Sequence, residues 1–221
     1  TPENVPSARA AFACLRASLA ATVASMMGYV GKRDALVTLI KVVDRDDESA
    51  ALGAAVAIFV LMGADATEQD VQSLIAKIPQ ITANQAKDFC VLALGRSRDS
   101  AAVSALMALL LDDQEDEEIR VSAAMSLALM ETIPSRDIDR MQRLATRTAD
   151  EVSLKVAQPV VHGLATKLDD EDWKAFLDKI PNPFVKAAAA EGRFHFTSLR
   201  ENSIEKEFEE LVETIQSSRP E

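Results

Sequence analysis

Few side chains in this chain of 221 residues are of the types that do chemistry. There are two histidines, His162 and His195. Neither has a carboxylate or a second histidine at ligand spacing on its expected helix. We therefore predict no metal site. We assign His162 to the end of a helix, just before Gly163, and His195 to a turn between two phenylalanines.

The two cysteines, Cys14 and Cys90, lie in predicted helices among apolar residues and have no histidine near them in the sequence. Nothing marks either as a thiolate nucleophile, so we interpret both as small buried hydrophobic residues. The run GRSR at 95–98 is too short for a phosphate-binding loop and matches no such pattern. We expect no catalytic residue, no cofactor and no enzymatic activity.

Acidic residues are concentrated in one short segment. Six carboxylates occupy the seven positions 112–118, DDQEDEE. Such a segment could receive a basic peptide or hold Ca²⁺ loosely, but it lacks the glycine and the distal glutamate of a calcium loop. We interpret it as a solvated turn whose acids favour the N-terminus of the next helix.

Four arginines recur at helical spacing: Arg136, Arg140, Arg143 and Arg147. On a helix this spacing places the four guanidinium groups on one face, opposite an apolar one. Two interpretations are open. The face is either a docking site for an acidic segment or phosphate group, or simply an outer, solvated surface. These four residues are our candidates for binding a protein partner.

The overall charge narrows the class of partner. The chain has 24 basic and 35 acidic residues and a net charge of −11, which argues against nucleic acid and against an anionic membrane surface. The longest apolar run, at 50–64, is too short to span a membrane. We expect a protein partner. Two lone thiols suit a reducing compartment, so we also expect a cytoplasmic location, with any targeting signal removed ahead of Thr1.

A repeat organises the elements that carry these residues. Six dipeptides that open alanine-rich helices recur along the chain with a period in the thirties. Such a period predicts stacked helical hairpins and an all-α fold. The dipeptides are Leu15-Arg16, Ala50-Ala51, Ala86-Lys87, Ile119-Arg120, Leu154-Lys155 and Val185-Lys186.

Local signals predict where the helices begin and end. Thr67 with Asp70, and Thr82 with Gln85, have the spacing of a capping box at a helix start. Glycine and proline end helices, and the residues expected to do so are Gly63, Pro79 and Gly95. After a disordered lead-in at 1–8, the expected helices include about 9–30, 49–63, 100–111, 117–132, 135–147, 151–167, 171–180 and 183–192.

The unit at 93–130 resembles the HEAT repeat family, including the HEAT-like repeats of bilin lyases, and the resemblance covers roughly residues 10–193. It implies a right-handed α-solenoid of about five to six hairpins. It also implies that an aspartate in the turn, Asp112 or Asp113, pairs with Arg120 at the start of the second helix. Asp44 and Asp150 occupy comparable turns, and Lys155 replaces the arginine in one unit.

The pattern changes after residue 193. Ser198 and Glu201 have capping-box spacing, and we predict an amphipathic capping helix at 194–217 after the repeats at 9–193. Its apolar stripe is Ile204, Phe208, Leu211, Val212 and Ile215. Its other face is acidic, with Glu205, Glu207, Glu209, Glu210 and Glu213.

The second helices of the hairpins are unusually apolar. Tight packing between small residues explains this, but a shallow apolar groove for a partner helix would have the same pattern. The adaptable contacts in such a groove would be Phe59, Met62, Met125 and Met130. Self-association through the same helices is a third possibility.

These features predict a non-enzymatic scaffold or adaptor that binds protein, as a domain of a larger protein or complex. The alternative is a HEAT-like lyase or chaperone for a small ligand, as the family resemblance allows. That alternative predicts a pocket with convergent polar groups around Trp173, His162 or His195.

Overall fold

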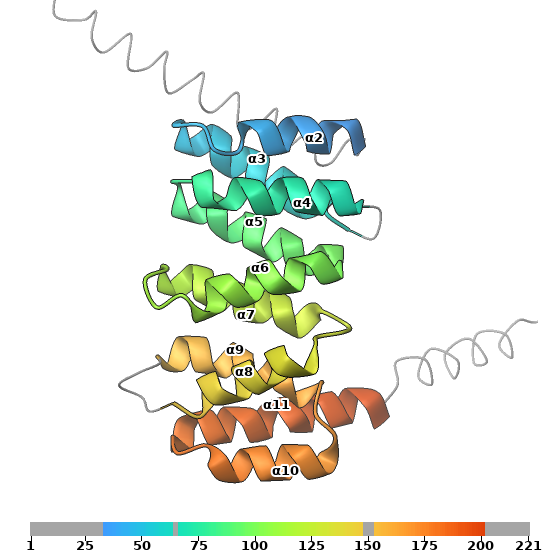
Figure 1. Cartoon of the computed structure of the whole chain (residues 1–221), viewed down its shortest axis with the longest axis vertical. Coiled ribbons are helices and arrows are strands. Elements are labelled where there is room, and N and C mark those ends of the chain that lie inside the picture. Colours follow the sequence, from blue (N-terminus) through green and yellow to red (C-terminus); the bar gives the residue numbers. More distant parts are fainter. Residues whose placement is uncertain (1–32, 64–65, 148–152, 202–221) are drawn as a thin grey trace, which may run out of the picture. The chain divides into compact units, whose positions relative to one another are not determined.

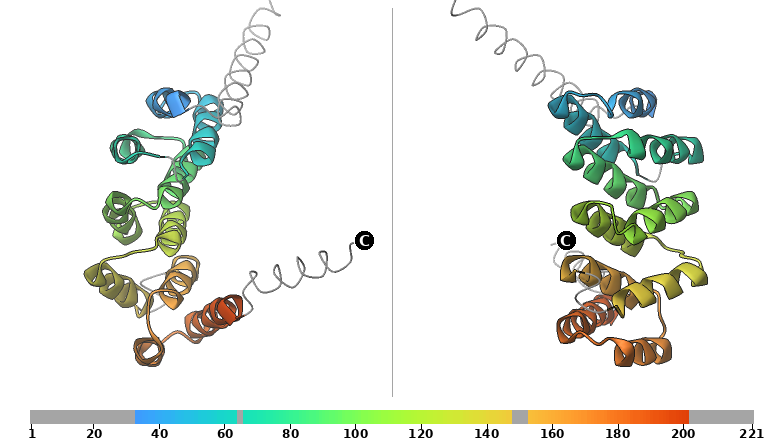
Figure 2. Two further views of the ribbon diagram at one scale, coloured as in Figure 1. Left: turned by 90° about the vertical axis from the view of Figure 1, so that its right-hand side faces the viewer. Right: turned by 60° about the vertical axis from the view of Figure 1, so that its left-hand side comes forward.

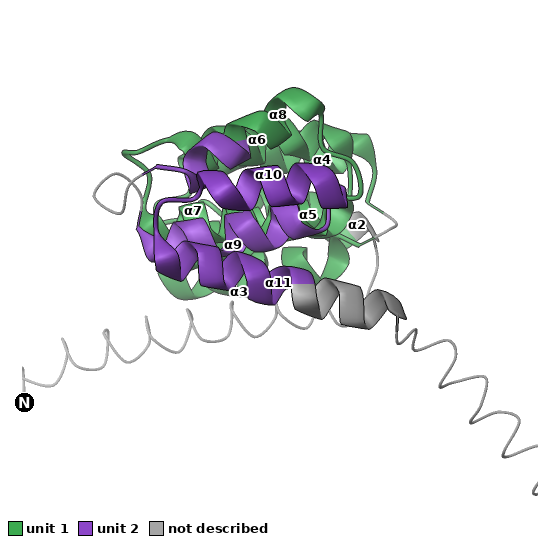
Figure 3. Ribbon diagram, turned by 90° about the horizontal axis from the view of Figure 1, so that it is seen from below, with its two compact units in different colours: residues 1–140 green, residues 141–221 purple. Residues whose placement is uncertain are grey.

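The computed structural model describes residues 33–63, 66–147 and 153–201. Every regular element in these ranges is helical (Figure 1), which confirms the predicted all-α class. The lead-in at 1–8, the expected helix at about 9–30 and residues 202–217 of the expected capping helix lie outside these ranges. The chain divides into two compact units, residues 1–140 and 141–221 (Figure 3).

Unit 1 is an ordered series of short helices. They are α2 (Arg33–Val42), α3 (Glu48–Leu61), α4 (Glu68–Lys77), the 3-10 turn η2 (Ile78–Gln80), α5 (Asn84–Ser97), α6 (Ser100–Leu111), α7 (Glu117–Leu129) and the first residues of α8 (Ser135–Ala145). The boundary between the units falls inside α8, after Arg140.

The helices of unit 1 pack in two rows. In one row α2 contacts α4 and α4 contacts α6, and in the other α3 contacts α5 and α5 contacts α7. The left view of Figure 2 shows the two rows side by side. Helices of the two rows also contact each other, as α2 does α3 and α6 does α7, and both rows contribute buried apolar residues to the core. Ile58, Leu94 and Leu127, which recur at the repeat period, are all fully buried.

Side-chain caps set several of the helix starts. Thr67 and Asp70 form a reciprocal capping box: the backbone N–H of Thr67 donates to Asp70 at 2.9 Å, and the Asp70 N–H donates to the Thr67 hydroxyl at 3.4 Å. This confirms the predicted start of α4. The predicted capping box of Thr82 and Gln85 is wrong. The N-cap of α5 is Ala83, which supplies no side-chain bond.

Two predicted helix ends differ in the structure. The helix expected to close at Gly63 ends at Leu61, with Met62 as its C-cap. The helix expected to end at Gly95 continues to Ser97. The left-handed residue after it is Arg98, with φ 53°. Gly95 is buried inside the helix, where the absence of a side chain allows close approach to α7.

Unit 2 contains the end of α8, then α9 (Leu154–Ala165), α10 (Asp170–Lys179) and α11 (Pro183–Glu201). Helices α9 and α11 pack against each other. The expected turn at 194–196 is wrong, because α11 continues through it and His195 is helical. The expected helix start at Ser198 is wrong for the same reason. No glycine or proline lies between 193 and 201 to stop the helix.

Candidate protein-binding surface

The exposed side of the α3, α5 and α7 row repeats in register. Nine positions, spaced i, i+4, i+8 along each helix and one repeat apart between helices, are exposed or half-buried. We call this set the outer stripe. Its members are Leu52, Val56 and Val60 on α3, Asp88, Leu92 and Arg96 on α5, and Val121, Met125 and Leu129 on α7.

Seven of the nine members of the outer stripe are apolar. Val60 is 37 % exposed, Met125 49 % and Leu129 57 %. Single exposed apolar residues are ordinary on protein surfaces, but a set of them on neighbouring helices is a candidate interaction site. The outer stripe is therefore the strongest candidate functional surface of unit 1.

The cation of the outer stripe, Arg96, lies over one ring of an aromatic pair. The guanidinium carbon of Arg96 lies 4.8 Å from the centre of the Phe59 ring. That ring meets Phe89 edge to face, at 6.0 Å between centroids and 70° between planes. Ring quadrupoles attract the cation and favour the edge-on geometry. The aromatic contacts thus join α3 to α5 and hold an exposed cation in the apolar surface.

Buried polar contacts fix α5 against α7 beneath the stripe. The Ser122 hydroxyl donates to the Asp88 carboxylate, and the Ser126 hydroxyl donates to the Val91 carbonyl at 3.0 Å. Both serines are buried. Because these bonds tie the two helices together, the side chains of the stripe are presented in a defined register rather than on independently moving helices.

The four residues named as contacts of a groove for a partner helix differ in exposure. Met125 is exposed and Phe59 is half-buried, in keeping with the expectation. The prediction for Met62 and Met130 is wrong, since these residues are 0 % and 1 % exposed. Each is the C-cap of its helix. The repeat spacing could have located the missing stripe members, Val60 and Leu129, in the sequence.

The predicted arginine face has a buried acid within it. The Asp137 side chain is only 2 % exposed, and it accepts from Arg140 Nη1 at 3.0 Å and lies 3.6 Å from Arg136 Nε. Arg143 is exposed on the same helix, and Arg147 follows the helix end. Two of the four candidate cations therefore neutralise a carboxylate of their own helix, which the spacing of arginines alone did not reveal.

Side chains of the acidic segment at 112–118 also form hydrogen bonds and ion pairs with nearby parts of unit 1. Asp116 caps α7, which matches the interpretation of the segment as a turn that favours the next helix. Lys87 pairs with Glu115 at 2.6 Å, and Asn84 donates to Asp116 at 3.2 Å. These bonds link the turn to α5.

The aspartate–arginine pair that the HEAT resemblance implies is present in this hairpin. Arg120 Nη2 lies 2.9 Å from Asp113 Oδ1, and Arg120 Nε donates to the Leu110 carbonyl at 3.2 Å. The comparable aspartate Asp44 pairs with Lys77 at 2.5 Å, and the hydrogen bond from Lys77 lowers the pKa of its carboxyl. Asp150 lies outside the described residues.

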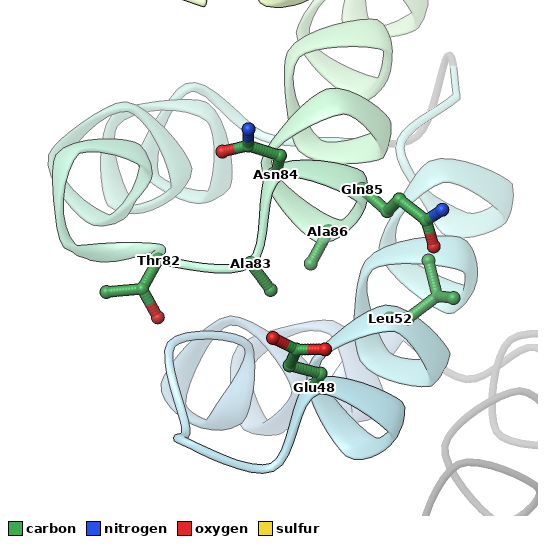
Figure 4. Close-up of a pocket in the computed structure, with 7 residues that line it drawn as sticks. All are labelled: Glu48, Leu52, Thr82, Ala83, Asn84, Gln85 and Ala86. Atoms are coloured by element: carbon green, nitrogen blue, oxygen red, sulfur yellow. The ribbon is translucent and has the colours of Figure 1, made fainter.

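A hollow of about 350 Å³ lies between the N-terminal ends of α3 and α5. It is lined by Glu48, Leu52, Thr82, Ala83, Asn84, Gln85 and Ala86. Figure 4 shows the Glu48 carboxylate turned into the hollow and the Asn84 amide turned away from it. The hollow is open to solvent, and the polar groups do not converge on one point as they do in a site for a small ligand.

The small-ligand alternative predicted a pocket around three residues, and the two whose side chains are described, His162 and Trp173, instead contact other parts of the protein. The His162 Nε2 atom lies 3.1 Å from the Ala188 carbonyl oxygen, which ties α9 to α11. Trp173 is 5 % exposed and lies against Phe176, with the Arg193 guanidinium 5.7 Å from its ring centre. The side chain of His195 lies outside the described residues.

Cys90 is fully buried, and burial raises the pKa of its thiol to about 12. Such a thiol stays protonated at neutral pH. Among the residues that the structure describes, no group of three or more histidine, cysteine, aspartate or glutamate side chains could hold a metal ion. In the same ranges, no helix is long and apolar enough to cross a membrane. Cys14 lies outside them.

Comparisons with protein-family models, with curated proteins and with solved structures found no match to this chain. The resemblance to HEAT repeats therefore remains a prediction from the residues quoted above.

Proposed function

We propose that this chain is a non-enzymatic scaffold or adaptor that binds protein, as part of a larger protein or complex in a reducing compartment such as the cytoplasm. The observation that carries the proposal is the outer stripe. It presents seven apolar side chains from three neighbouring helices, in register, with one exposed arginine among them. A surface of this kind suits the apolar face of a partner helix.

We further propose that the hairpins form a right-handed solenoid of HEAT type. Recurrent contacts between successive hairpins support this. Asp44 pairs with Lys77 and Arg98 with Glu131, and the two partners of each pair lie one repeat apart in the sequence. Ser122 bonds to Asp88 at nearly the same separation. Contacts that recur at the repeat length are what nearest-neighbour stacking produces.

The arginine face is a weaker docking candidate than the outer stripe. The buried Asp137 carboxylate neutralises part of the positive charge of Arg136 and Arg140. The arginine face would therefore attract an acidic partner less strongly than four unpaired arginines would. Arg143 is exposed, and its guanidinium is not among those that contact Asp137, so an acidic segment would contact it first. We therefore assign the arginines a secondary role in binding.

Substituting the two most exposed apolar members of the stripe tests the proposal. Met125→Glu with Leu129→Glu places two charges, one helical turn apart, where a partner would bury apolar surface. The matched control is Ser104→Glu with Ala108→Glu, also exposed and one turn apart, but on α6 in the other row. Both variants should melt within a few degrees of the unsubstituted chain, because exposed substitutions change stability by about 0.5 kcal/mol or less.

The binding readout is quantitative mass spectrometry of proteins captured from native lysate by each variant. We expect a defined set of proteins to be lost by the Met125/Leu129 variant and retained by the Ser104/Ala108 control. An identical set for all three chains would show that the stripe binds nothing in that lysate, and the proposal would fail.

A further inference from the structure

The surface formed by the outer stripe and the adjoining hollow carries opposite charges at its two ends. Arg96, near the C-terminal end of α5, lies over Phe59, near the C-terminal end of α3. The hollow joins the N-terminal ends of the same two helices, so α3 and α5 run parallel. At this second end, Glu48 is the first residue of α3 and Asp88 lies in the second turn of α5. The surface is therefore acidic at one end, basic at the other and apolar between them.

The hollow suits one long basic side chain from a partner. Glu48 is exposed and turns its carboxylate into the hollow (Figure 4), and this side chain forms no hydrogen bond or ion pair in the part of the chain that the structure describes. Leu52, Ala83 and Ala86 contribute apolar lining. Lysine and arginine lay their methylene groups along apolar surface and keep the charge at the polar tip. Such a side chain would fill the hollow and place its charge on the Glu48 carboxylate.

A second copy of this chain is a poorer occupant than a single helix. In an antiparallel pair of stripes, Arg96 of one copy would approach Glu48 of the other, but its guanidinium is held over the Phe59 ring and does not reach into a hollow. A stable interface also takes about 20–30 residues from each partner, whereas the outer stripe has nine members. One amphipathic helix needs less surface and can supply a basic side chain that is free to enter the hollow.

The distance between the charged ends sets the spacing on the partner. Phe59, which is level with Arg96, follows Glu48 by eleven residues, so the two ends lie roughly 16 Å apart along α3 at about 1.5 Å per residue. Residues about eleven apart on a partner helix are three turns apart and share a face. Helices favour acidic residues near the N-terminus and basic residues near the C-terminus. The acidic N-terminal end of the partner therefore meets Arg96, and its basic C-terminal end enters the hollow.

We propose that the outer stripe binds an amphipathic helix of another protein that runs antiparallel to α3 and α5. A lysine or arginine near the C-terminal end of this helix pairs with Glu48 in the hollow. An aspartate or glutamate near its N-terminal end pairs with Arg96, and the apolar face between them covers the stripe. The proposal rests on the proposed function of the stripe, and names the chemistry of its partner. Water excluded by the apolar contact strengthens both ion pairs.

Fluorescence anisotropy with two model helices and the full chain tests the proposal. The charged peptide is built of alanine and glutamine, with leucines along one face, a glutamate near its N-terminal end and an arginine about three turns later. The neutral peptide has glutamine in place of both charged residues. We expect the charged peptide to bind about tenfold more tightly, because each of two partly exposed ion pairs contributes up to about fivefold.

Variants of the chain assign the charge at the hollow. Glu48→Gln should weaken binding of the charged peptide about three- to fivefold and leave binding of the neutral peptide unchanged. The matched control is Glu68→Gln, which also replaces an exposed glutamate at the first position of a helix, but on α4 in the other row. This control should change the binding of neither peptide.

Photo-crosslinking reports the direction of the bound helix. The probe is p-benzoylphenylalanine, placed at one end of the charged peptide or at the other. At the C-terminal end it should attach to residues 82–86 or 48–52, which line or adjoin the hollow. At the N-terminal end it should attach near Arg96 and Val60.

Several results would overturn the proposal. They are failure of the charged peptide to bind, equal affinities of the two peptides, equal effects of Glu48→Gln and Glu68→Gln, and crosslinks in the reverse direction. Dimerisation of the unsubstituted chain in sedimentation, abolished by Met125→Glu with Leu129→Glu, would also overturn it, because a second copy would then occupy the stripe. Capture of lysate proteins through Met125 and Leu129 depends on neither Glu48 nor the model helices. The chemistry of the partner can therefore be wrong while the proposed function stands.

Discussion

Gly95 of α5 lies so close to Ser126 of α7 that a Cβ on Gly95 would lie 2.7 Å from the Ser126 Cα. The neighbouring atom is backbone, which cannot rotate away. Together with the bond from the Ser126 hydroxyl to the Val91 carbonyl, this contact sets the distance between the two helices that carry most of the outer stripe.

Gly95→Ala should therefore destabilise the protein, although alanine favours helices more than glycine does. Forcing α5 and α7 apart should cost about 1–3 kcal/mol in the free energy of unfolding, measured by urea denaturation. The control is Gly63→Ala, where an added Cβ would meet nothing within 4 Å. Equal stability of the two variants would show that the helices adjust without cost.

Arg120→Ala should destabilise the protein by about 1–2 kcal/mol. The Arg120 side chain is 11 % exposed and satisfies both the Leu110 carbonyl at the end of α6 and the Asp113 carboxylate. Glu131→Ala, which breaks the exposed pair with Arg98, should cost less than about 0.5 kcal/mol. Thermal unfolding followed by circular dichroism compares the two, and a larger loss for Glu131→Ala would contradict the assignment.

Arg140→Glu and Arg143→Glu should differ in stability although the two residues share a helix. The first places a carboxylate beside the buried Asp137, 2 % exposed, and removes its partner, so we expect a loss of about 1–3 kcal/mol. The second changes an exposed side chain, and we expect about 0.5 kcal/mol or less. Similar urea midpoints for both would mean that Arg136 alone satisfies Asp137.

Asp44→Asn should lower stability at neutral pH but not in acid. Lys77 holds the pKa of the Asp44 carboxyl below its ordinary value of 3.8, so the folded state prefers the ionised form. That contribution is fully present above the unfolded pKa and is lost as the pH falls through the folded value. The difference in melting temperature between the unsubstituted chain and the variant should be small at pH 7 and should shrink as the pH falls below 3.8. A difference in melting temperature that grows as the pH falls would contradict the predicted sign of the Asp44 contribution.

Cys90 should resist alkylation until the protein unfolds. Its thiol is buried, and its pKa of about 12 leaves almost no thiolate at pH 8. Iodoacetamide labelling followed by peptide mapping should modify Cys90 only in denaturant. Rapid labelling of Cys90 in buffer would reveal an opening of α5 that the packing of the helix does not suggest.

Sequence and structure agree where a helix boundary depends on neighbours in the chain. The box of Thr67 and Asp70 starts α4, and Asp116 caps α7, because each cap bonds to backbone close by in the chain. The repeat spacing likewise places equivalent side chains of α3, α5 and α7 in register, so the outer stripe could be located from the sequence. Its members differ between helices in side-chain type and in exposure: Met125 is exposed, whereas the equivalent Val56 and Leu92 are half-buried.

Tertiary structure decided what no local signal contains. Gly95 resembles a helix end but serves a close contact with α7, and the capping pattern of Thr82 is not used. The arginine spacing suggested four solvated cations, yet a buried Asp137 lies among them. Local patterns determine which face of a helix is apolar. Whether a side chain on that face is exposed, as Met125 is, or buried, as Met62 is, depends on which distant helix covers it.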